Sequence, residues 1–238
     1  MSNPSDAGSM APGEDAPEVP SFPARVGQTF FSPGTLTTAL AARPAWGAAL
    51  ALGAILVFLQ SVLIPAEVWE LMFRETLVQR GQEMPEGMAG GGAAIMRISA
   101  IVAGPIMYTL MTFLMAGVAT LIFSFVLGDD GKYRQYLAMI THALLIPSFV
   151  GLLLVPLKIM QQNPQLTLNL ATFFPFVPEG YLLNVLTMLE LSQFWAWFVV
   201  ALGARAIDGR RSVGSAFAVL VGLSVVLALI FASFMPTG

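Results

Sequence analysis

The sequence predicts an all-α membrane protein, a five-transmembrane-helix bundle with short interfacial helices and a disordered N-terminal tail. Of the 238 residues, 56% are hydrophobic and only 11% are charged, whereas about 25% of residues are charged in an average soluble protein. The uncharged residues gather in long runs, and about 20 helical residues suffice to cross a hydrocarbon core of about 30 Å. The chain has no Cys and a single His, which excludes disulfide scaffolds, thiol catalysis and most metal sites.

The N-terminal segment, residues 1–29, is predicted to be a disordered, acidic and Pro-rich cytosolic tail. Before Arg25 it contains four acidic residues, five prolines and no Lys or Arg. Such a composition cannot bury enough apolar surface to offset the entropy lost on folding. We therefore place the membrane domain at residues 30–235.

A short interfacial helix is expected directly after the tail, over residues 33–42. The Ser32 hydroxyl can cap free backbone amides, and Pro33 suits the first helical position. Phe31 and Leu36 stand at the positions of a hydrophobic staple. This helix leads into the first span.

A second surface helix is expected at residues 65–80, between the first and second spans. Its apolar and charged side chains are segregated with the helical period, which is typical of a helix lying on a membrane surface. The apolar side carries Val68, Trp69, Met72 and Phe73, and the polar side carries Glu67, Glu70 and Arg74. Gly81 is the predicted stop of this helix.

The five predicted spans account for most of the remaining chain. They cover residues 45–64, 98–127, 135–157, 182–204 and 212–235. Only residues 128–134 separate the second span from the third, so these two helices must form an antiparallel hairpin. The Gly131-Lys132 pair in this connection lacks the first Gly and the Ser or Thr of a phosphate-binding loop. We interpret the connection, including Asp129 and Asp130, as a solvated turn.

The distribution of Lys and Arg predicts the orientation in the membrane. Seven of them lie on the side of the N-terminal tail, called the tail side below: Arg25, Arg43, Lys132, Arg134, Arg205, Arg210 and Arg211. Four lie across the membrane: Arg74, Arg80, Arg97 and Lys158. This bias favours an N terminus on the inner side of the membrane and, after five crossings, a C terminus outside.

Several short motifs follow one another from about residue 30 to residue 220. They are Phe31-Ser32-Pro33, Arg43-Pro44-Ala45-Trp46, Gly131-Lys132-Tyr133-Arg134-Gln135, His142-Ala143-Leu144-Leu145-Ile146-Pro147, and then Glu190, Phe194, Trp195 and Gly203. In this order they resemble the Yip1-domain family of multispanning membrane proteins, particularly its bacterial members. The resemblance implies a five-helix bundle with a cytosolic N terminus, as a multi-pass protein of the bacterial inner (cell) membrane. Eukaryotic relatives are associated with Rab-type GTPases and with traffic between endoplasmic reticulum and Golgi, but their Asp-Leu-Tyr-Gly-Pro motif has no match in this sequence.

Two ionisable residues inside predicted spans are the candidate functional sites. His142 lies about 10 Å inside the tail-side edge of the third span, and an ionisable group at such a depth is a functional candidate. It can equally be a neutral imidazole that is hydrogen-bonded to a neighbouring helix. Glu190 is either a buried proton or cation site or an interfacial carboxylate that the dipole of the fourth helix stabilises. The two residues are expected in opposite leaflets, so a His-Glu dyad is not predicted.

Small residues recur every four positions on two spans, which lets helices approach closely. One stripe is Gly214, Ala218 and Gly222, and the other is Ala116, Thr120 and Ser124. Both are expected to pack within the bundle, and a homo-oligomer contact is the alternative.

The sequence therefore favours a non-catalytic scaffold, or a membrane-organising or trafficking-type component, that acts through protein and lipid contacts. Arg205, Arg210 and Arg211 are the candidate lipid-facing basic cluster, because a basic residue near anionic lipid contributes about 1 kcal/mol. The expected partners are the lipid bilayer, including anionic lipids, and an unidentified membrane protein. No cofactor, metal, enzymatic activity or nucleic-acid partner is expected. The alternative is a small transporter or permease subunit that uses Glu190 and His142, and an intramembrane enzyme would need a nucleophile and a base at one depth.

Overall fold

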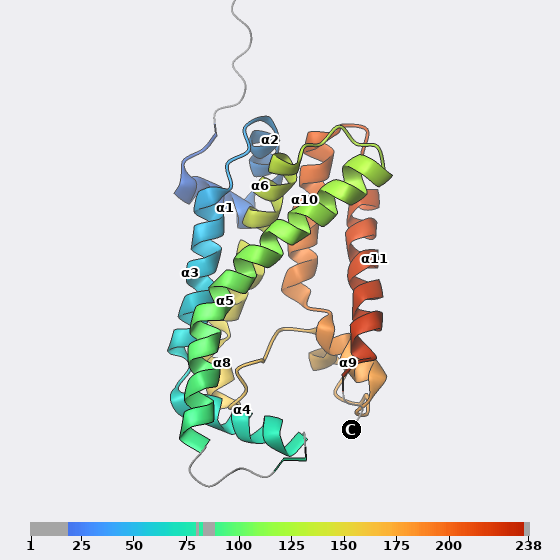
Figure 1. Ribbon diagram of the computed structural model, residues 1–238. Helices are drawn as coiled ribbons and strands as arrows, with labels where there is room; N and C mark the ends of the chain where they lie inside the picture. Colours follow the sequence, from blue (N-terminus) through green and yellow to red (C-terminus); the bar gives the residue numbers. More distant parts are fainter. Residues whose placement is uncertain (1–18, 80, 83–88, 236–238) are drawn as a thin grey trace, which may run out of the picture.

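The structure is a computed structural model, and it describes residues 19–79, 81–82 and 89–235. Its helices are α1 (Phe22–Phe31), α2 (Pro33–Ala42), α3 (Gly47–Leu63), α4 (Ala66–Gln79), α5 (Ala89–Thr120), the π-helix η1 (Leu121–Val126), α6 (Tyr133–Ala143), α7 (Leu145–Leu153), α8 (Val155–Met160), the 3-10 helix η2 (Leu170–Phe173), α9 (Tyr181–Met188), α10 (Leu191–Ile207) and α11 (Val213–Ala232). Within the described ranges the only strand-like feature is one isolated bridge between Asn169 and Glu190. Figure 1 shows long helices running between an end that carries α1 and α2 and an end that carries α4. The all-helical class is thereby confirmed.

The start of the chain is more ordered than the sequence predicted. α1 covers the last part of the 1–29 segment, which is therefore helical there and not disordered, while residues 1–18 lie outside the described residues. The Arg25 side chain reaches back onto the chain after α2: Nη1 donates a hydrogen bond to the Ala45 carbonyl oxygen at 3.1 Å. Arg25 is only 8% exposed. α1 is stabilised by contacts with residues far away in the sequence. The proline-rich composition of the segment does not reveal such contacts.

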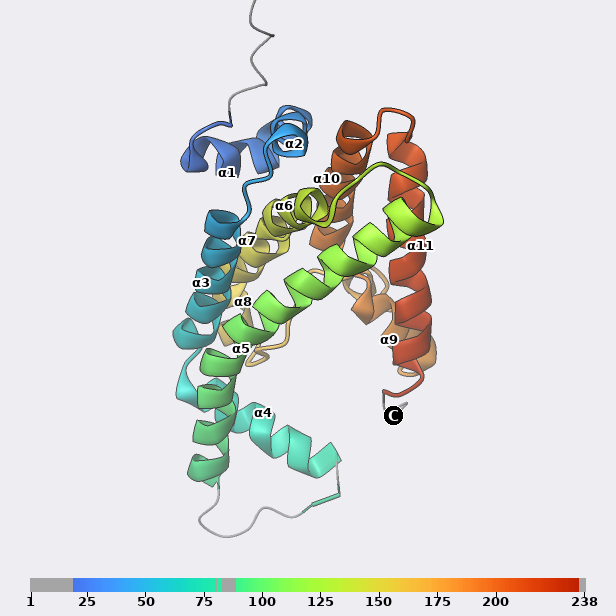
Figure 2. The same cartoon turned by 45° about the horizontal axis from the view of Figure 1, so that its top comes forward.

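α1 and α2 lie across the tail-side end of the bundle, as Figure 2 shows. α2 occupies the position predicted for the first interfacial helix. Its Leu36 and Leu40 are fully buried against Ala138 and Met139 of α6. The predicted staple does not form, because Leu36 packs into the bundle while Phe31 is 87% exposed.

α3 matches the first predicted span, and a bend of 85° leads from it into α4. α4 confirms the predicted surface helix over Ala66–Gln79, and its Val68 and Trp69 are buried against the bundle. Gly81 has φ of +64°, and its amide donates to the Val78 carbonyl oxygen at 2.9 Å. This left-handed residue ends the helix, as predicted.

α5 is the longest helix and crosses the others obliquely (Figure 1). It begins at Ala89, well before the predicted start of the second span at residue 98. Its early glycines do not stop it because α4 packs closely there: a side chain at Gly92 would overlap the Phe73 ring. Its outward side is a row of exposed apolar residues: Ile98, Val102, Ile106, Leu110 and Leu114. A contiguous apolar surface of this kind suits lipid better than water.

The third predicted span is a broken helix at the centre of the bundle. It is divided into α6, α7 and α8 at Leu144 and Leu154, shortly before Pro147 and Pro156. Proline lacks the amide that continues the helical ladder, so breaks at these places are expected. Of its most apolar window 67% is buried, against 22% for the windows of α5 and α11. This segment therefore forms the core around which the outer helices pack.

The prediction of the fourth span as one helix over residues 182–204 is wrong. α9 ends at Met188, and α10 begins at Leu191. At the break the Leu170 amide donates to the Leu189 carbonyl oxygen at 2.9 Å, and the Leu191 amide donates to the Leu168 carbonyl oxygen at 2.8 Å. Backbone pairing with an earlier segment interrupts the helix, and the hydropathy of the span itself does not reveal such pairing.

Three helical segments of the described chain are long and apolar enough to cross a membrane: Gly90–Val126, Tyr133–Leu153 and Val213–Ala232. The bent pair of α3 and α4 adds a fourth if it counts as one span. α10 is a shorter apolar helix of 17 residues. These helices support a membrane location, and the count of five crossings stays a prediction.

The two stripes of small residues differ in their surroundings. Ala116 is fully buried in the main core, so its stripe serves packing within the bundle. Gly214, Ala218 and Gly222 are exposed, so the stripe on α11 faces away from the chain's own bundle. The expectation of internal packing is wrong for this second stripe, because α11 turns its opposite side to the core, with Ala216 and Leu220 buried.

Candidate functional site

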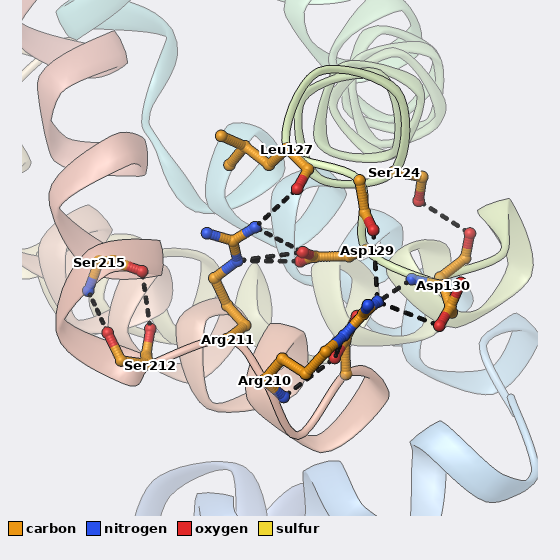
Figure 3. Close-up of polar contacts among 11 residues, drawn as sticks. Ser124, Leu127, Asp129, Asp130, Arg210, Arg211, Ser212 and Ser215 are labelled. Atoms are coloured by element: carbon orange, nitrogen blue, oxygen red, sulfur yellow. Dashed lines mark hydrogen bonds and ion pairs between the residues drawn. The ribbon is translucent and has the colours of Figure 1, made fainter.

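Five charged side chains from two tail-side loops form one cluster, called the charged junction below (Figure 3). Asp129 and Asp130 belong to the connection between η1 and α6, while Asp208, Arg210 and Arg211 belong to the connection between α10 and α11. Apart from the pair of Glu70 and Arg74 in α4, the ion pairs of the described chain join members of this cluster. The junction therefore ties the hairpin of α5 and α6 to the hairpin of α10 and α11.

The pair of Asp129 and Arg211 is the buried part of the charged junction. The two side chains are only 4% and 18% exposed. Arg211 Nη2 donates to Asp129 Oδ1 at 2.5 Å, and Arg211 Nε lies 3.1 Å from both carboxylate oxygens. Nη2 also donates to the Leu127 carbonyl oxygen at 3.2 Å. A guanidinium fork of this kind fixes both charges in a single geometry.

The second half of the junction is centred on Asp208. Arg210 Nη2 donates to Asp208 Oδ2 at 2.6 Å, and the Arg210 backbone amide donates to Oδ1 at 2.9 Å. The same Nη2 reaches Asp130 Oδ2 at 3.1 Å. The Asp130 amide in turn donates to Asp208 Oδ2 at 3.3 Å. Asp208 is buried although Asp130 and Arg210 are exposed, so it is the anchor that both loops share.

The backbone of the first loop is shaped to present these carboxylates. Gly128 has φ of +74°, a conformation that residues with a side chain rarely adopt. The turn allows the Asp129 amide to donate to the Phe123 carbonyl oxygen at 2.9 Å. The Ser124 hydroxyl donates to the Gly131 carbonyl oxygen at 2.8 Å (Figure 3). These two hydrogen bonds connect the π-helix η1 to the loop that follows it.

The ion pairs shift the pKa values of the junction's side chains in the direction that favours their charged forms. Hydrogen bonds from Arg210 lower the pKa of the Asp208 carboxyl well below its ordinary value. The same contact raises the pKa of Arg210, and hydrogen bonds to Asp129 raise the pKa of Arg211. These shifts favour the charged forms of Asp208 and the two arginines, so their ion pairs persist at neutral pH.

The junction bears on two predictions made from the sequence. Arg210 and Arg211 form ion pairs with carboxylates of the two loops, and only Arg205 of the predicted cluster has no ion pair within the described chain; contact of this cluster with lipid stays a prediction. The connection is an exposed turn at most of its residues, as expected, but Asp129 is buried in it, at 7% exposed. The sequence contained a signal for this pairing, because one short tail-side loop has two adjacent acidic residues and another has two adjacent arginines.

A different set of cations remains free on the tail side, and we call it the basic surface. It consists of Arg43, Lys132, Arg134 and Arg205, which are exposed and form no salt bridge with any described residue. Lys132 and Arg134 line a groove of about 440 Å³ at the end of α2, together with Ala41 and Pro44. Arg205 lies at the other end of α2, beside Gly34 and Thr38.

His142, the first candidate from the sequence, is fully buried in α6. Its Nδ1 lies 2.8 Å from the Ala138 carbonyl oxygen. A carbonyl only accepts, so Nδ1 carries the proton and Nε2 is left as an acceptor, with no partner among the described residues. The imidazole is thus bonded within its own helix and not to a neighbouring one.

Glu190, the second candidate, is the residue that precedes α10. Its Oε1 accepts a hydrogen bond from the Ser192 hydroxyl at 2.6 Å. Burial lowers the pKa of the Lys158 ammonium, and the negative charge of Glu190 opposes that shift. By helix rise, Glu190 lies about 26 Å from the tail-side end of α10 and His142 about 14 Å from the start of α6. The structure does not bring the two residues together, in agreement with the expectation that they form no dyad.

The geometry defines a helical membrane protein whose tail-side loops are locked by ion pairs. Within its described residues, no group of three His, Asp or Glu side chains is placed to hold a metal ion. The Yip1 domain matches residues 27–235, and the chain therefore belongs to the Yip1-domain family. Comparison with curated proteins and with solved structures gave no match.

Proposed function

We propose that this Yip1-domain protein is a non-catalytic scaffold or membrane-organising component of the bacterial inner membrane, and that it acts through a tail side that faces the cytoplasm. The observation that carries the proposal is the basic surface. Its four cations are unpaired, whereas the described tail-side acids, Asp129, Asp130 and Asp208, are all held in the charged junction. Among the described residues, the tail side therefore carries excess positive charge, while the four acidic residues before Arg25 lie outside the described residues.

The basic surface is mounted on a packed platform. α2 is held by its buried leucines and by Gln135, whose Nε2 donates to the Ala41 carbonyl oxygen at 2.7 Å. Cations on a fixed platform lose less conformational freedom on binding than cations on a mobile tail. The chemistry of this surface fits the phosphates of anionic lipids, with about 1 kcal/mol from each basic residue near the membrane.

A five-crossing topology is consistent with the helix lengths. α3 and α10 each have 17 residues, or about 26 Å at 1.5 Å per residue, which is close to the thickness of a hydrocarbon core. Counting α3, α5, α6 with α7, α10 and α11 as crossings leaves the C terminus on the side opposite to the tail.

Lipid retention by the purified protein tests the basic surface. Lys132→Gln, Arg134→Gln and Arg205→Gln should each weaken association with phosphatidylglycerol about fivefold, because about 1 kcal/mol is lost per charge. Arg74→Gln is the matched control, since Arg74 lies in α4 and pairs with Glu70. Native mass spectrometry of protein released from nanodiscs of mixed anionic and zwitterionic lipid measures the retained lipid. Equal retention by all four variants would contradict the proposal.

The orientation is tested by single cysteines, which have no background in this chain. A cysteine at Lys132 should be protected from a membrane-impermeant maleimide in intact cells, and one at Gln162 should be labelled. The reverse pattern would place the basic surface outside the cell and would exclude the proposed role.

Crosslinking in native membranes tests the scaffold role itself. A membrane protein that is captured by the wild type and by Arg74→Gln, but not by the Lys132→Gln, Arg134→Gln and Arg205→Gln triple variant, supports a partner bound at the basic surface. Transport is the competing function, and it has less support because His142 and Glu190 do not meet. A proton-coupled flux in reconstituted vesicles that is lost in Glu190→Gln would favour transport over the scaffold.

A further inference from the structure

A polar pocket lies within the membrane-spanning bundle, between α3, α5, α7 and α10. Its volume is about 260 Å³, and its polar lining consists of Gln60, Tyr108, Ser148 and Gln193. Gln60 lies near the end of α3 and Gln193 near the start of α10, whereas Met115 and Leu144 lie nearer the tail side, so the pocket is at middle depth in the bundle. It is separate from the charged junction and from the basic surface.

Two hydrogen-bond donors in the pocket have no partner among the described residues. They are Tyr108 Oη and Gln193 Nε2, and both atoms are buried. Two other donors of the lining are already used: Gln60 Nε2 donates to the Ser148 carbonyl oxygen at 3.0 Å, and the Ser148 hydroxyl donates to the Leu144 carbonyl oxygen at 2.8 Å. In a hydrocarbon environment an unpaired donor costs several kcal/mol. Two such donors beside one pocket indicate that something else satisfies them.

The backbone makes room for these polar side chains. Gly53 of α3 is buried, and a side chain there would overlap the Tyr108 phenol. A side chain at Gly151 of α7 would overlap the Gln60 amide. Glycine at these two positions lets the neighbouring helices carry a large polar side chain at a close crossing. The pocket is therefore a feature of the helix packing and not a gap left by a small side chain.

The lining also limits the chemistry of a ligand. No lining residue is charged, so the pocket offers nothing to neutralise an ion. Gln193 Nε2 can only donate and the Tyr108 hydroxyl can donate, so one acceptor oxygen can satisfy both groups. Met111 and Met115 border the pocket, and Met111 is 46% exposed on the outer surface of α5. Methionine adapts to varied apolar shapes, so an apolar ligand can enter from the bilayer beside Met111.

We propose that this intramembrane pocket binds a neutral, lipid-soluble molecule through a carbonyl oxygen that accepts hydrogen bonds from Tyr108 Oη and Gln193 Nε2. A pocket of about 260 Å³ holds one ring or a short polar segment, and the apolar remainder of the ligand lies in the bilayer. An ester carbonyl of a glycerolipid and a ring carbonyl of a quinone share this chemistry.

The thermal midpoint of the full-length protein in detergent, followed by Trp fluorescence, tests the proposal. Dioctanoylglycerol is the ester probe, decyl-ubiquinone is the quinone probe, and dodecane is the probe without oxygen. One of the two carbonyl probes should raise the midpoint in a saturable way, and dodecane should not. The probe that acts identifies the source of the carbonyl.

Two variants remove one donor each. Tyr108→Phe and Gln193→Met should weaken the affinity for the active probe about three- to tenfold, as expected for one neutral hydrogen bond. Thr109→Val is the control, because the Thr109 hydroxyl donates to the Pro105 carbonyl oxygen and does not line the pocket. Unchanged affinity in both donor variants, or no response of the wild type to either carbonyl probe, would overturn the proposal. If one donor variant does not fold, the other and the probe titration still decide the result.

Discussion

The charged junction and the intramembrane pocket are both clusters of polar side chains, and they satisfy those side chains in opposite ways. In the junction, the buried carboxylates of Asp129 and Asp208 are each bonded to an arginine. In the pocket, Tyr108 Oη and Gln193 Nε2 have no partner among the described residues. The junction is complete as a structure, whereas the pocket is complete only with a ligand. The two clusters differ in whether their polar groups have partners. Paired groups indicate a structural role, and unpaired buried groups indicate a candidate binding site.

The largest effect is expected from breaking the buried pair in the junction. Arg211→Met leaves the Asp129 carboxylate without its partner, and the loss of one member of a buried pair costs about 3 kcal/mol. The free energy of unfolding in detergent should fall by about this amount. Arg205→Met is the control and should change stability little, because Arg205 is exposed and has no ion pair with a described residue.

The second member of the same pair distinguishes charge from packing. If the loss in Arg211→Met comes from the unpaired carboxylate, then adding Asp129→Leu should recover a large part of it. A double variant as unstable as Arg211→Met alone would show that the pair is needed for the shape of the two loops.

A smaller loss is expected at the helix crossing beside the pocket. Gly53→Ala places a methyl group against the Tyr108 ring, and overpacking of this kind costs about 1–3 kcal/mol. Gly117→Ala is a matched change in another spanning helix, and no atom lies within 4 Å of the added carbon. It should leave stability unchanged or raise it by up to about 1 kcal/mol, because alanine favours the helix. If both variants behave alike, the close crossing at Gly53 is not a constraint.

The pH dependence of stability sharpens the comparison further. The pKa of Asp208 is depressed in the folded chain, so its contribution is present above the unfolded pKa of about 3.9 and is lost as the pH falls towards the folded pKa. Thermal midpoints from pH 7 to pH 3 should decline less in Asp208→Asn than in the wild type. Glu67→Gln, which changes an exposed carboxylate in α4, should follow the wild-type curve.

The smallest loss is expected from Tyr108→Phe without ligand. The phenol oxygen forms no hydrogen bond with a described residue, so the substitution loses no hydrogen bond and removes an unpaired donor, and the free energy of unfolding should stay the same or rise. Ser224→Ala removes the acceptor of the Trp197 Nε1 hydrogen bond, which is 2.7 Å long, and it should cost about 1 kcal/mol. A larger loss in Tyr108→Phe than in Ser224→Ala would mean that the pocket is already satisfied from within.

Local patterns predicted much of the fold because each depends on neighbours in the chain. The helix after Ser32 follows from capping, and the surface helix that ends at Gly81 follows from the amphipathic period and the glycine stop. α1 was missed because its order comes from Arg25 and other contacts with residues far along the chain. The break before Leu191 was missed for the same reason, since Leu168 and Leu170 supply the pairing.

The sequence by itself determined the membrane class, the approximate helices and the family resemblance, because hydropathy and short motifs are written in consecutive residues. Only the tertiary structure decided which charges are free. Arg211 and Asp129 are far apart in the chain and meet across two loops, and Tyr108 and Gln193 come from helices that cross at one place. Ion pairing and burial depend on which residues are close in space, and the order of residues in the sequence does not show this.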